Sequence, residues 1–312
     1  MRVVFAGSAE FSLPVLRALA ASDQELVKVL TAPDRAGSRG AAAPRPVKAA
    51  AESLGIPIAQ PPRLTEDVWH QVSSQSRADV LVVAAYGQLI PLSVLDSLRQ
   101  GGLGVHPSLL PRHRGASPVV AAILAGDSRT GVTVFRMVQH LDSGPILGQA
   151  ELPLGGSDTT ASLSAKLAEL GGDVAVQVLR RLEAGGVTEI AQLESAATYS
   201  HRLSRQDGRL DWTFTAEIID RHLRALSPWP GVTVPLSGKQ VKLLRGAPDP
   251  SAQVARQLAP GEILQQGQDW ILVQTLEGAY RVELIQPPGG PQMSPAAFLR
   301  GRQRAPRGHS SA

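Results

Sequence analysis

The stretch that organises this chain reads Gly102-Leu-Gly-Val-His106-Pro-Ser-Leu-Leu-Pro111-Arg-His-Arg-Gly115-Ala-Ser-Pro118. Residues 103–105 have the pattern of the end of a short buried strand, which places His106 at the carboxyl edge, where open α/β sheets hold their reactive groups. Ser117-Pro118 is an N-cap and first-turn pair, and the apolar run 119–125 predicts a short helix after it. The order of strand, polar loop and helix makes His106 the first catalytic candidate.

A catalytic histidine needs a neighbour, because an imidazole relays protons well only when another group fixes its tautomer or holds its charge. Asp142 lies in the turn-rich segment 139–145, after an apolar strand predicted over residues 131–137. A lone histidine in a loop is as a rule solvated or caps a turn. The pair of His106 and Asp142, rather than either residue alone, is therefore the predicted catalytic unit.

Composition narrows the class of protein. The chain has 312 residues, of which 43% are hydrophobic, so two domains with real cores are expected. It has no cysteine, which excludes disulfides, thiolate nucleophiles and cysteine-ligated zinc. No apolar run reaches the length of about 18 residues that a spanning helix needs, and residues 1–6 have the pattern of a strand rather than a leader. A cytoplasmic protein without a metal is expected.

The first half of the chain has an α/β pattern. Strands are predicted over residues 2–7, 26–31 and 78–85, and the first is followed by a segment with helical apolar spacing. The opening lacks the GxGxxG fingerprint, so a dinucleotide is not indicated. A helix over 158–183, with its apolar stripe broken at Gly171-Gly172, is expected to close the first domain.

The pattern changes after a glycine-rich boundary. A helix is predicted from about Thr215 to Leu226, followed by short alternating strands with Gly/Pro turns, which is typical of a small β-barrel. Trp212 and Trp229 are expected in its core. The predicted division is a first domain over 1–185, a linker over 186–204 and a second domain over 205–312.

Positive charge gathers in two places. Segment 33–48 carries four basic residues and one acidic residue, and is either a mobile solvated loop or an arm that orders on a polyanion. Residues 199–312 carry 14 Lys and Arg against 9 Asp and Glu, which is either a solvated face or a surface for a nucleic-acid backbone. The candidate phosphate contacts are Arg35, Arg39, Arg45 and Lys48 in the first place and Arg202, Arg205, Arg209, Lys239 and Lys242 in the second.

These motifs together resemble the folate-dependent formyltransferases, in which a strand ends in Asn-x-His, a Ser-Leu-Leu-Pro loop follows, and an aspartate lies farther along the chain. The matching residues are Gly104-Val105-His106, Ser108-Leu109-Leu110-Pro111, Arg114-Gly115-Ala116 and Leu141-Asp142-Ser143-Gly144. The family's opening Gly-x-x-x-Phe-x-x-Pro matches residues 7–14, and its Ala-Tyr-Gly-x-x-x-Pro matches residues 85–91. Asp211-Trp212 and Pro228-Trp229-Pro230-Gly231 are similar to the C-terminal domain of a member that acts on tRNA, so the resemblance covers nearly the whole chain.

The resemblance implies a Rossmann-like α/β domain with a parallel-rich sheet and a C-terminal OB-like barrel. It implies direct transfer of a formyl group from 10-formyltetrahydrofolate to the α-amine of initiator methionyl-tRNA, by a monomer without metal, DNA or membrane. His106 would relay a proton and Asp142 would orient it. The implied folate-binding residues are Tyr86, Gly87, Gln88, Ile90, Gly104, Ser108, Leu109, Leu110 and Pro111. A basic loop in tRNA-acting members favours tRNA contacts by Arg35, Arg39, Arg45 and Lys48, with Arg202, Arg205 and Arg209 in the second domain.

One position departs from the family pattern. Gly104 stands where the family has the asparagine assigned to the formyl oxygen, and this chain contains no asparagine at all. Gln88, Gln139, Ser108, a backbone amide or a water molecule are the candidate replacements for that hydrogen-bond donor. Two other functions stay open: formyl transfer to a small amine, and a non-catalytic relative that binds folate or tRNA.

Overall fold

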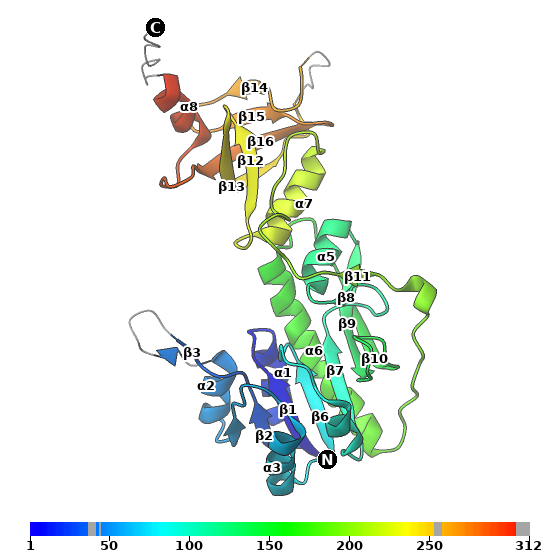
Figure 1. Cartoon of the computed structure of the whole chain (residues 1–312). Coiled ribbons are helices and arrows are strands. Elements are labelled where there is room, and N and C mark those ends of the chain that lie inside the picture. Colours follow the sequence, from blue (N-terminus) through cyan, green and yellow to red (C-terminus); the bar gives the residue numbers. More distant parts are fainter. Residues whose placement is uncertain (37–41, 44, 253–257, 304–312) are drawn as a thin grey trace. The chain divides into compact units, whose positions relative to one another are not determined.

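The computed structural model describes residues 1–36, 42–43, 45–252 and 258–303, and its contacts divide the chain into two compact units (Figure 1). The first unit contains Met1–Ala122, Asp127–Gly156 and Ala161–His201. The second contains Ile123–Gly126, Ser157–Thr160 and Arg202–Ala312.

A mostly parallel sheet of seven strands is the centre of the first unit, in the order β10-β9-β7-β6-β1-β2-β5. Five strands run parallel and two, β9 and β10, pair antiparallel at one edge. The order reverses between β1 and β6, the point where open α/β sheets bind their ligands. The bounds are β1 (Arg2–Gly7), β2 (Glu25–Leu30), β5 (Ile58–Ala59), β6 (Val80–Ala84), β7 (Gly102–His106), β9 (Arg129–Arg136) and β10 (Ile146–Pro153). The predicted fold class is confirmed.

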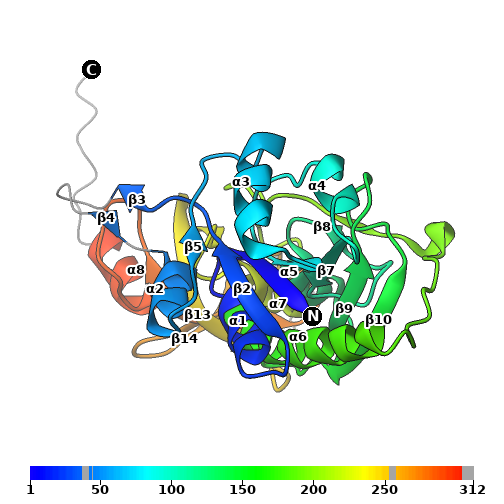
Figure 2. The ribbon, with the colours of Figure 1, turned by 90° about the horizontal axis from the view of Figure 1, so that it is seen from below.

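Helices cover both faces of this sheet (Figure 2). On one face, Trp69 of α3 (Glu66–Ser76) and Leu95 of α4 (Leu92–Asp96) pack against Val4 and Leu81 of the central strands. The other face is covered by α1 (Ser12–Ala20) and α6 (Thr160–Glu183). The remaining helices that begin in this part of the chain are α2 (Pro46–Ser53) and α5 (Pro118–Ala125).

Helix α6 is continuous, as expected from its apolar spacing, and it runs through the two glycines, Gly171 and Gly172, that interrupt its apolar stripe. A Cβ added to Gly171 would lie 3.0 Å from Val105 of β7, and one added to Gly172 would lie 2.7 Å from the Cβ of Ala18 in α1. Glycine in a helix costs about 1 kcal/mol relative to alanine. Here it lets the helix lie directly against β7 and α1, and packing therefore outweighs propensity.

The segment predicted as a linker contributes structure to the first unit. Ile190 forms a bridge with Ile146 at the start of β10, and a 3-10 turn follows at Glu194–Ala196. Strand β11 (Tyr199–Ser200) then pairs in parallel with β8 (Arg114–Gly115), inside the loop that follows His106. The chain thus returns to the candidate site before it enters the second unit.

The second unit is built on an antiparallel sheet in the order β12-β13-β16-β15-β14, with helix α7 (Ala216–Leu226) packed on β13 and β12. The predicted helix from about Thr215 to Leu226 is confirmed, and the hydroxyl of Thr215 accepts a hydrogen bond from the Ile218 amide and caps it. The bounds are β12 (Val232–Leu236), β13 (Lys239–Pro248), β14 (Ile263–Gln266), β15 (Ile271–Gln274), β16 (Ala279–Gln286) and α8 (Pro295–Gln303). Trp212 is buried and donates to the Pro235 carbonyl, whereas Trp229 is 57% exposed and its expected core position is wrong.

The described part of the basic segment 33–48 contains secondary structure. Strands β3 (Arg35–Ala36) and β4 (Ala42–Ala43) pair with each other, and α2 begins at Pro46. The Lys48 ammonium lies 2.6 Å from an Asp34 carboxylate oxygen, and Arg45 donates to the Pro33 carbonyl. Arg39 lies outside the described residues. Within the described ranges, no helix has the length and hydropathy needed to cross a bilayer.

Candidate active site

His106 is the last residue of β7, on the edge of the sheet that the sequence predicted. Its side chain is buried, and its Nε2 lies 2.9 Å from the carbonyl oxygen of His113. A carbonyl only accepts hydrogen bonds, so this contact assigns a proton to Nε2. Nδ1 is then the nitrogen left to take up and release a proton.

The structure brings Asp142 to the Nδ1 side of the same imidazole. Asp142 Oδ2 lies 3.7 Å from Nδ1, and both side chains are largely buried. Strand β9 runs antiparallel to β7 and ends opposite Gly102 and Leu103, at the amino end of β7, and the turn that follows β9 carries Asp142 to the imidazole. The same carboxylate oxygen accepts the Gly115 amide at 2.8 Å. The carboxylate is therefore fixed by the backbone of the loop that carries His113.

Gln192 braces the Asp142 loop. Its amide nitrogen donates to the carbonyls of Asp142 (2.8 Å) and Gly144 (2.7 Å), and its amide oxygen accepts from Arg114 Nε (3.0 Å). Arg114 is buried, and its Nη1 reaches Glu194 and the Tyr199 hydroxyl. Nothing in the sequence indicated this network. Gln192 lies in a segment that contains no recognisable motif and that was predicted to be a linker.

The carbonyl that holds His106 belongs to a strongly anchored residue. His113 has a left-handed backbone (φ 56°), and its amide donates to Thr198 Oγ1. Its Nε2 lies 2.7 Å from Asp127, whose other carboxylate oxygen accepts from Arg112 at 2.6 Å. Burial opposes ionisation of Asp127, but the hydrogen bonds from Arg112 and His113 outweigh it and hold the pKa of that carboxyl below its usual value.

The Ser108 to Pro111 loop holds itself together. The Ser108 hydroxyl is buried and donates to the Arg112 carbonyl, and the Ser108 carbonyl accepts from Thr133 Oγ1. The Leu110 amide donates to the same Thr133 hydroxyl. Leu110 is buried, while Leu109 and Pro111 are partly exposed. The Ser108 hydroxyl therefore donates its hydrogen bond within the loop and is not available to donate to a ligand.

The segment after β6 lies at the same edge of the sheet. The Gln88 side chain accepts a hydrogen bond from the Leu64 amide and donates one to the Pro61 carbonyl, so both ends of its amide are already hydrogen-bonded within the protein. Tyr86 is buried, burial raises its pKa to about 12, and its hydroxyl has no hydrogen-bond partner among the described residues. Gly87 is exposed and Ile90 partly buried. Of the side chains proposed to replace the family asparagine, Gln139 alone is uncommitted, and it is exposed.

Position 104 has no room for a side chain. A Cβ placed on Gly104 would lie 2.5 Å from Cζ of Phe135, closer than the 3.0 Å that real Cβ atoms keep. Phe135 is the register partner of Gly104 on β9 and is itself buried. The glycine that departs from the family pattern is thus matched by an aromatic ring in the adjacent strand.

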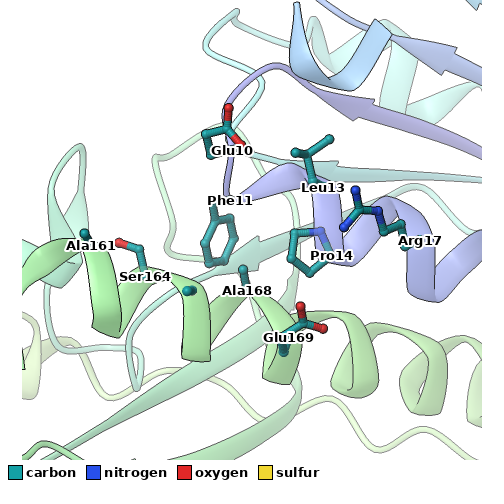
Figure 3. A pocket seen from close by; sticks show the side chains of 10 residues that line it. Glu10, Phe11, Leu13, Pro14, Arg17, Ala161, Ser164, Ala168 and Glu169 are labelled. Atoms are coloured by element: carbon teal, nitrogen blue, oxygen red, sulfur yellow. The ribbon is translucent and has the colours of Figure 1, made fainter. Parts of the chain in front are cut away.

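A cavity of about 390 Å³ lies between α1 and α6, on the face of the sheet opposite to α3 and α4 (Figure 3). Phe11, Pro14 and Arg17 of the β1 exit and α1 face Ser164, Ala168 and Glu169 of α6 across it. Neither His106 nor Asp142 lines this cavity. It is a feature separate from the candidate catalytic pair.

The candidate tRNA contacts of the second unit lie on the surface, since Arg202, Arg205 and Arg209 are all exposed. In the first unit, Arg45 and Lys48 are half-buried and bonded as described above. Among the residues that the structure describes, no group of histidine, aspartate and glutamate side chains is arranged to hold a metal ion.

Comparisons with known proteins identify the family of this chain. Residues 1–179 match the family model described as formyl transferase, and residues 202–303 match the formyl transferase C-terminal domain. The chain is 41% identical over 310 residues to the methionyl-tRNA formyltransferase of Gluconobacter oxydans (99% of each chain). It is 42% identical to that of Stenotrophomonas maltophilia K279a (97% of this chain, 98% of the relative).

Among solved structures, the N-formyltransferase of Helicobacter canadensis, in complex with folinic acid and dTDP-3-aminofucose, is similar with a TM-score of 0.69. The match covers 92% of this chain and 99% of that one at 13% identity, so it concerns the fold alone. The two matched domain models and the full-length relatives carry the assignment further. This chain belongs to the formyl transferase family.

Proposed function

We propose that this protein transfers the formyl group of 10-formyltetrahydrofolate to the α-amine of initiator methionyl-tRNA. The full-length relatives at 41% and 42% identity carry that name. The observation that carries the proposal is the His106–Asp142 pair at the carboxyl edge of β7, with one imidazole nitrogen fixed by the His113 carbonyl. A reaction that moves one proton between two nitrogens needs such a group.

The chemistry balances without a protein nucleophile. When bound, the folate supplies an activated formyl group: the amine nitrogen forms a bond to the formyl carbon, and the bond from that carbon to the folate nitrogen breaks. One proton must pass from the incoming to the leaving nitrogen. We assign this proton to Nδ1 of His106, and Asp142 stabilises the imidazole while it carries the charge.

The residues present fit a folate at this edge. Tyr86 has a buried hydroxyl that lacks a partner in the described chain, and it follows β6 where the strand order reverses. We infer that Tyr86, Gly87 and Ile90 line the pteridine side of the pocket, with Leu109, Leu110 and Pro111 opposite. Gln88 and Ser108 serve instead by shaping these two segments through their own hydrogen bonds. Gly104 is not proposed to line this pocket, because the Phe135 ring covers the face on which its side chain would stand.

We propose that residues 1–185 form the catalytic and folate-binding part and that residues 205–312 bind the tRNA backbone. Of the segment 186–204 predicted as a linker, the part up to His201 belongs to the first unit. Exposed arginines at 202, 205 and 209 support this assignment, because phosphate recognition needs accessible charge. Arg35, Arg39, Arg45 and Lys48 are proposed to contact the tRNA from the first unit.

The test is formyl transfer with three acceptors at equal concentration: methionyl-charged initiator tRNA, the same tRNA uncharged, and a nucleotide-linked amino sugar. Labelled 10-formyltetrahydrofolate is the donor, and formyl-methionine is detected after deacylation of the tRNA. We expect transfer to the charged tRNA alone, because only it combines a free α-amine with a polyanion.

Transfer to the amino sugar alone would replace this proposal with a small-amine transferase. Folate and tRNA binding by calorimetry without any turnover would identify a non-catalytic relative. Both outcomes contradict the proposed activity.

A further inference from the structure

On the face of β7 that carries His106, the preceding residues have no side chains. Side chains alternate along a strand, so Gly102, Gly104 and His106 share one face. Two glycines therefore lead up to the imidazole. The space above them is filled by side chains from other elements, and each glycine admits a different one.

Leu95 and Met137 occupy the space over Gly102, and the ring of Phe135 occupies the space over Gly104. Phe135 is the cross-strand partner of Gly104 and is buried, packed in a small cluster with Leu110, Ile146 and Met137. A Cβ at Gly102 would come closer than 3.0 Å to Leu95, and one at Gly104 would come closer than 3.0 Å to Phe135. The two positions are thus equally intolerant of a side chain, for different neighbours.

Only the second neighbour reaches the catalytic candidate. The Phe135 and His106 rings stand edge to face, with centroids 6.5 Å apart and planes at 88°. The imidazole has its Nε2 on the His113 carbonyl and its Nδ1 toward Asp142. Two nitrogen contacts define positions in the ring plane, whereas an aromatic edge contact limits rotation of the plane itself.

We propose that Phe135 is a positioning residue that sets the plane of the His106 imidazole, and that Gly104 is the position that admits the Phe135 ring. The pair acts as a unit: the glycine has no function of its own beyond making room. This inference rests on the proposed function for its kinetic consequences, but the orientation of His106 is a property of the free protein.

The test compares Gly104→Ala, Phe135→Leu and the double variant with Gly102→Ala as the matched control. Gly104→Ala pushes the ring away from its place, and Phe135→Leu removes it. Gly102→Ala imposes a similar clash on the same strand and face, but onto Leu95 and Met137. Aromatic pairs contribute enough to predict a drop in kcat of about 2- to 10-fold in both single variants at position 104 or 135.

We expect KM for either substrate to stay within about twofold of wild type, because ground-state binding is untouched. The double variant should be no slower than Phe135→Leu alone, since leucine leaves no ring for the new Cβ to displace. Gly102→Ala should lose stability but keep kcat. The proposal fails if Gly104→Ala and Gly102→Ala reduce kcat equally, or if the two changes at 104 and 135 multiply.

Nitrogen-15 NMR of labelled histidine in the free protein gives a readout that needs no activity. Wild type should show distinct Nδ1 and Nε2 resonances for His106, and these should move toward averaged values in Gly104→Ala and Phe135→Leu but not in Gly102→Ala. Unchanged His106 resonances in the first two variants overturn the proposal. If wild type transfers no formyl group, the proposed function fails while this measurement still decides the role of Phe135.

Discussion

The His106 site and the arginines at 202, 205 and 209 use polar side chains in different ways: the first holds them in a fixed geometry, and the second exposes their charge. The two nitrogens of His106 and the Asp142 carboxylate have partners at set distances: the His113 carbonyl lies 2.9 Å from Nε2, the Asp142 carboxylate 3.7 Å from Nδ1, and the Gly115 amide 2.8 Å from that carboxylate. Arg202, Arg205 and Arg209 are exposed side chains. Proton transfer depends on position, whereas attraction of a phosphate backbone depends mainly on charge. Substitutions in the two regions should therefore fail in different ways.

The largest effect is expected at His106. His106→Gln removes the group that relays the proton, and kcat should fall about 10²- to 10⁴-fold with tRNA affinity retained. Single-turnover transfer and equilibrium tRNA binding separate the two quantities. His140→Gln, an exposed histidine beside the Asp142 turn, is the control and should leave kcat unchanged. Equal losses in both variants would remove His106 from the mechanism.

Asp142 sharpens the comparison within the site. Asp142→Asn keeps the size of the side chain but removes its charge, and kcat should fall on the order of 10²-fold because the imidazole loses its electrostatic partner. Asp79→Asn is a matched control, since the Asp79 carboxylate also accepts a backbone amide at 2.8 Å, that of Arg2, far along the strand from the reactive edge. A kcat that falls in both would show that loss of a fold contact, not loss of charge beside His106, is responsible.

Gln192 tests whether the site extends into the segment that the sequence predicted as a linker. Gln192→Leu breaks three hydrogen bonds around Asp142 and Arg114 and should reduce kcat about tenfold, equivalent to ~1.4 kcal/mol. Gln139→Leu removes an exposed glutamine from the neighbouring turn and should not. Rescue of part of the activity by Gln192→Glu is not expected, because a carboxylate cannot donate to the two carbonyls.

The arginines should respond to salt rather than to geometry. Changing Arg202, Arg205 and Arg209 together to glutamine should leave kcat at saturating tRNA intact and weaken tRNA binding. The slope of log K against log salt should fall by about 0.7–0.9 for each lost phosphate contact. Arg63→Gln, an exposed arginine of the first unit, is the control. An unchanged slope in the triple variant would assign these arginines to a solvated face.

The smallest effect is expected from pH at Asp79. The Arg2 amide hydrogen bond holds the pKa of this carboxyl below its ordinary value of 3.8, against the opposing effect of burial, and Arg99 adds to it. A depressed folded-state pKa stabilises the protein above the unfolded pKa, and the contribution disappears as pH falls through the folded value. Urea unfolding should show Asp79→Asn less stable by about 1 kcal/mol at pH 7. The difference should shrink below pH 3.8; a constant difference would exclude the ionised carboxylate as its cause.

The sequence predicted the main elements of the fold, and it singled out His106 and Asp142, which the structure brings within 3.7 Å, because both follow from local patterns. The strand before His106 and the turn at Asp142 have clear apolar and turn signals, and the turn that follows β9 carries Asp142 to the imidazole. The single helix over 158–183 was predicted from its apolar spacing, but the reason for Gly171-Gly172 within it could not be, since it depends on what packs against the glycines. Lys48 was expected as a loop cation and lies instead on α2 against Asp34, a pairing set by tertiary structure.

Other parts of the site had no signal in the sequence at all. The match between Gly104 and Phe135 depends on strand register, which composition does not reveal. Gln88 and Ser108 were expected to face a ligand, but their hydrogen-bonding groups are used by nearby backbone. A polar side chain near a site can either bind a ligand or hydrogen-bond to the surrounding backbone, and only the three-dimensional structure shows which of the two it does.

The pairing of β11 with β8 determines when this site is complete during synthesis. His106 and Asp142 leave the ribosome early, but the residues that fix their loops, Gln192, Thr198 and Ser200, come 50 or more positions after Asp142. A nascent chain that ends at residue 185 contains the strands of the sheet, His106 and Asp142, but it lacks the side chains to which the His113 amide and the Asp142 carbonyl are hydrogen-bonded. The contacts around His106 are therefore complete only when the last residues of the first unit, up to His201, have been made.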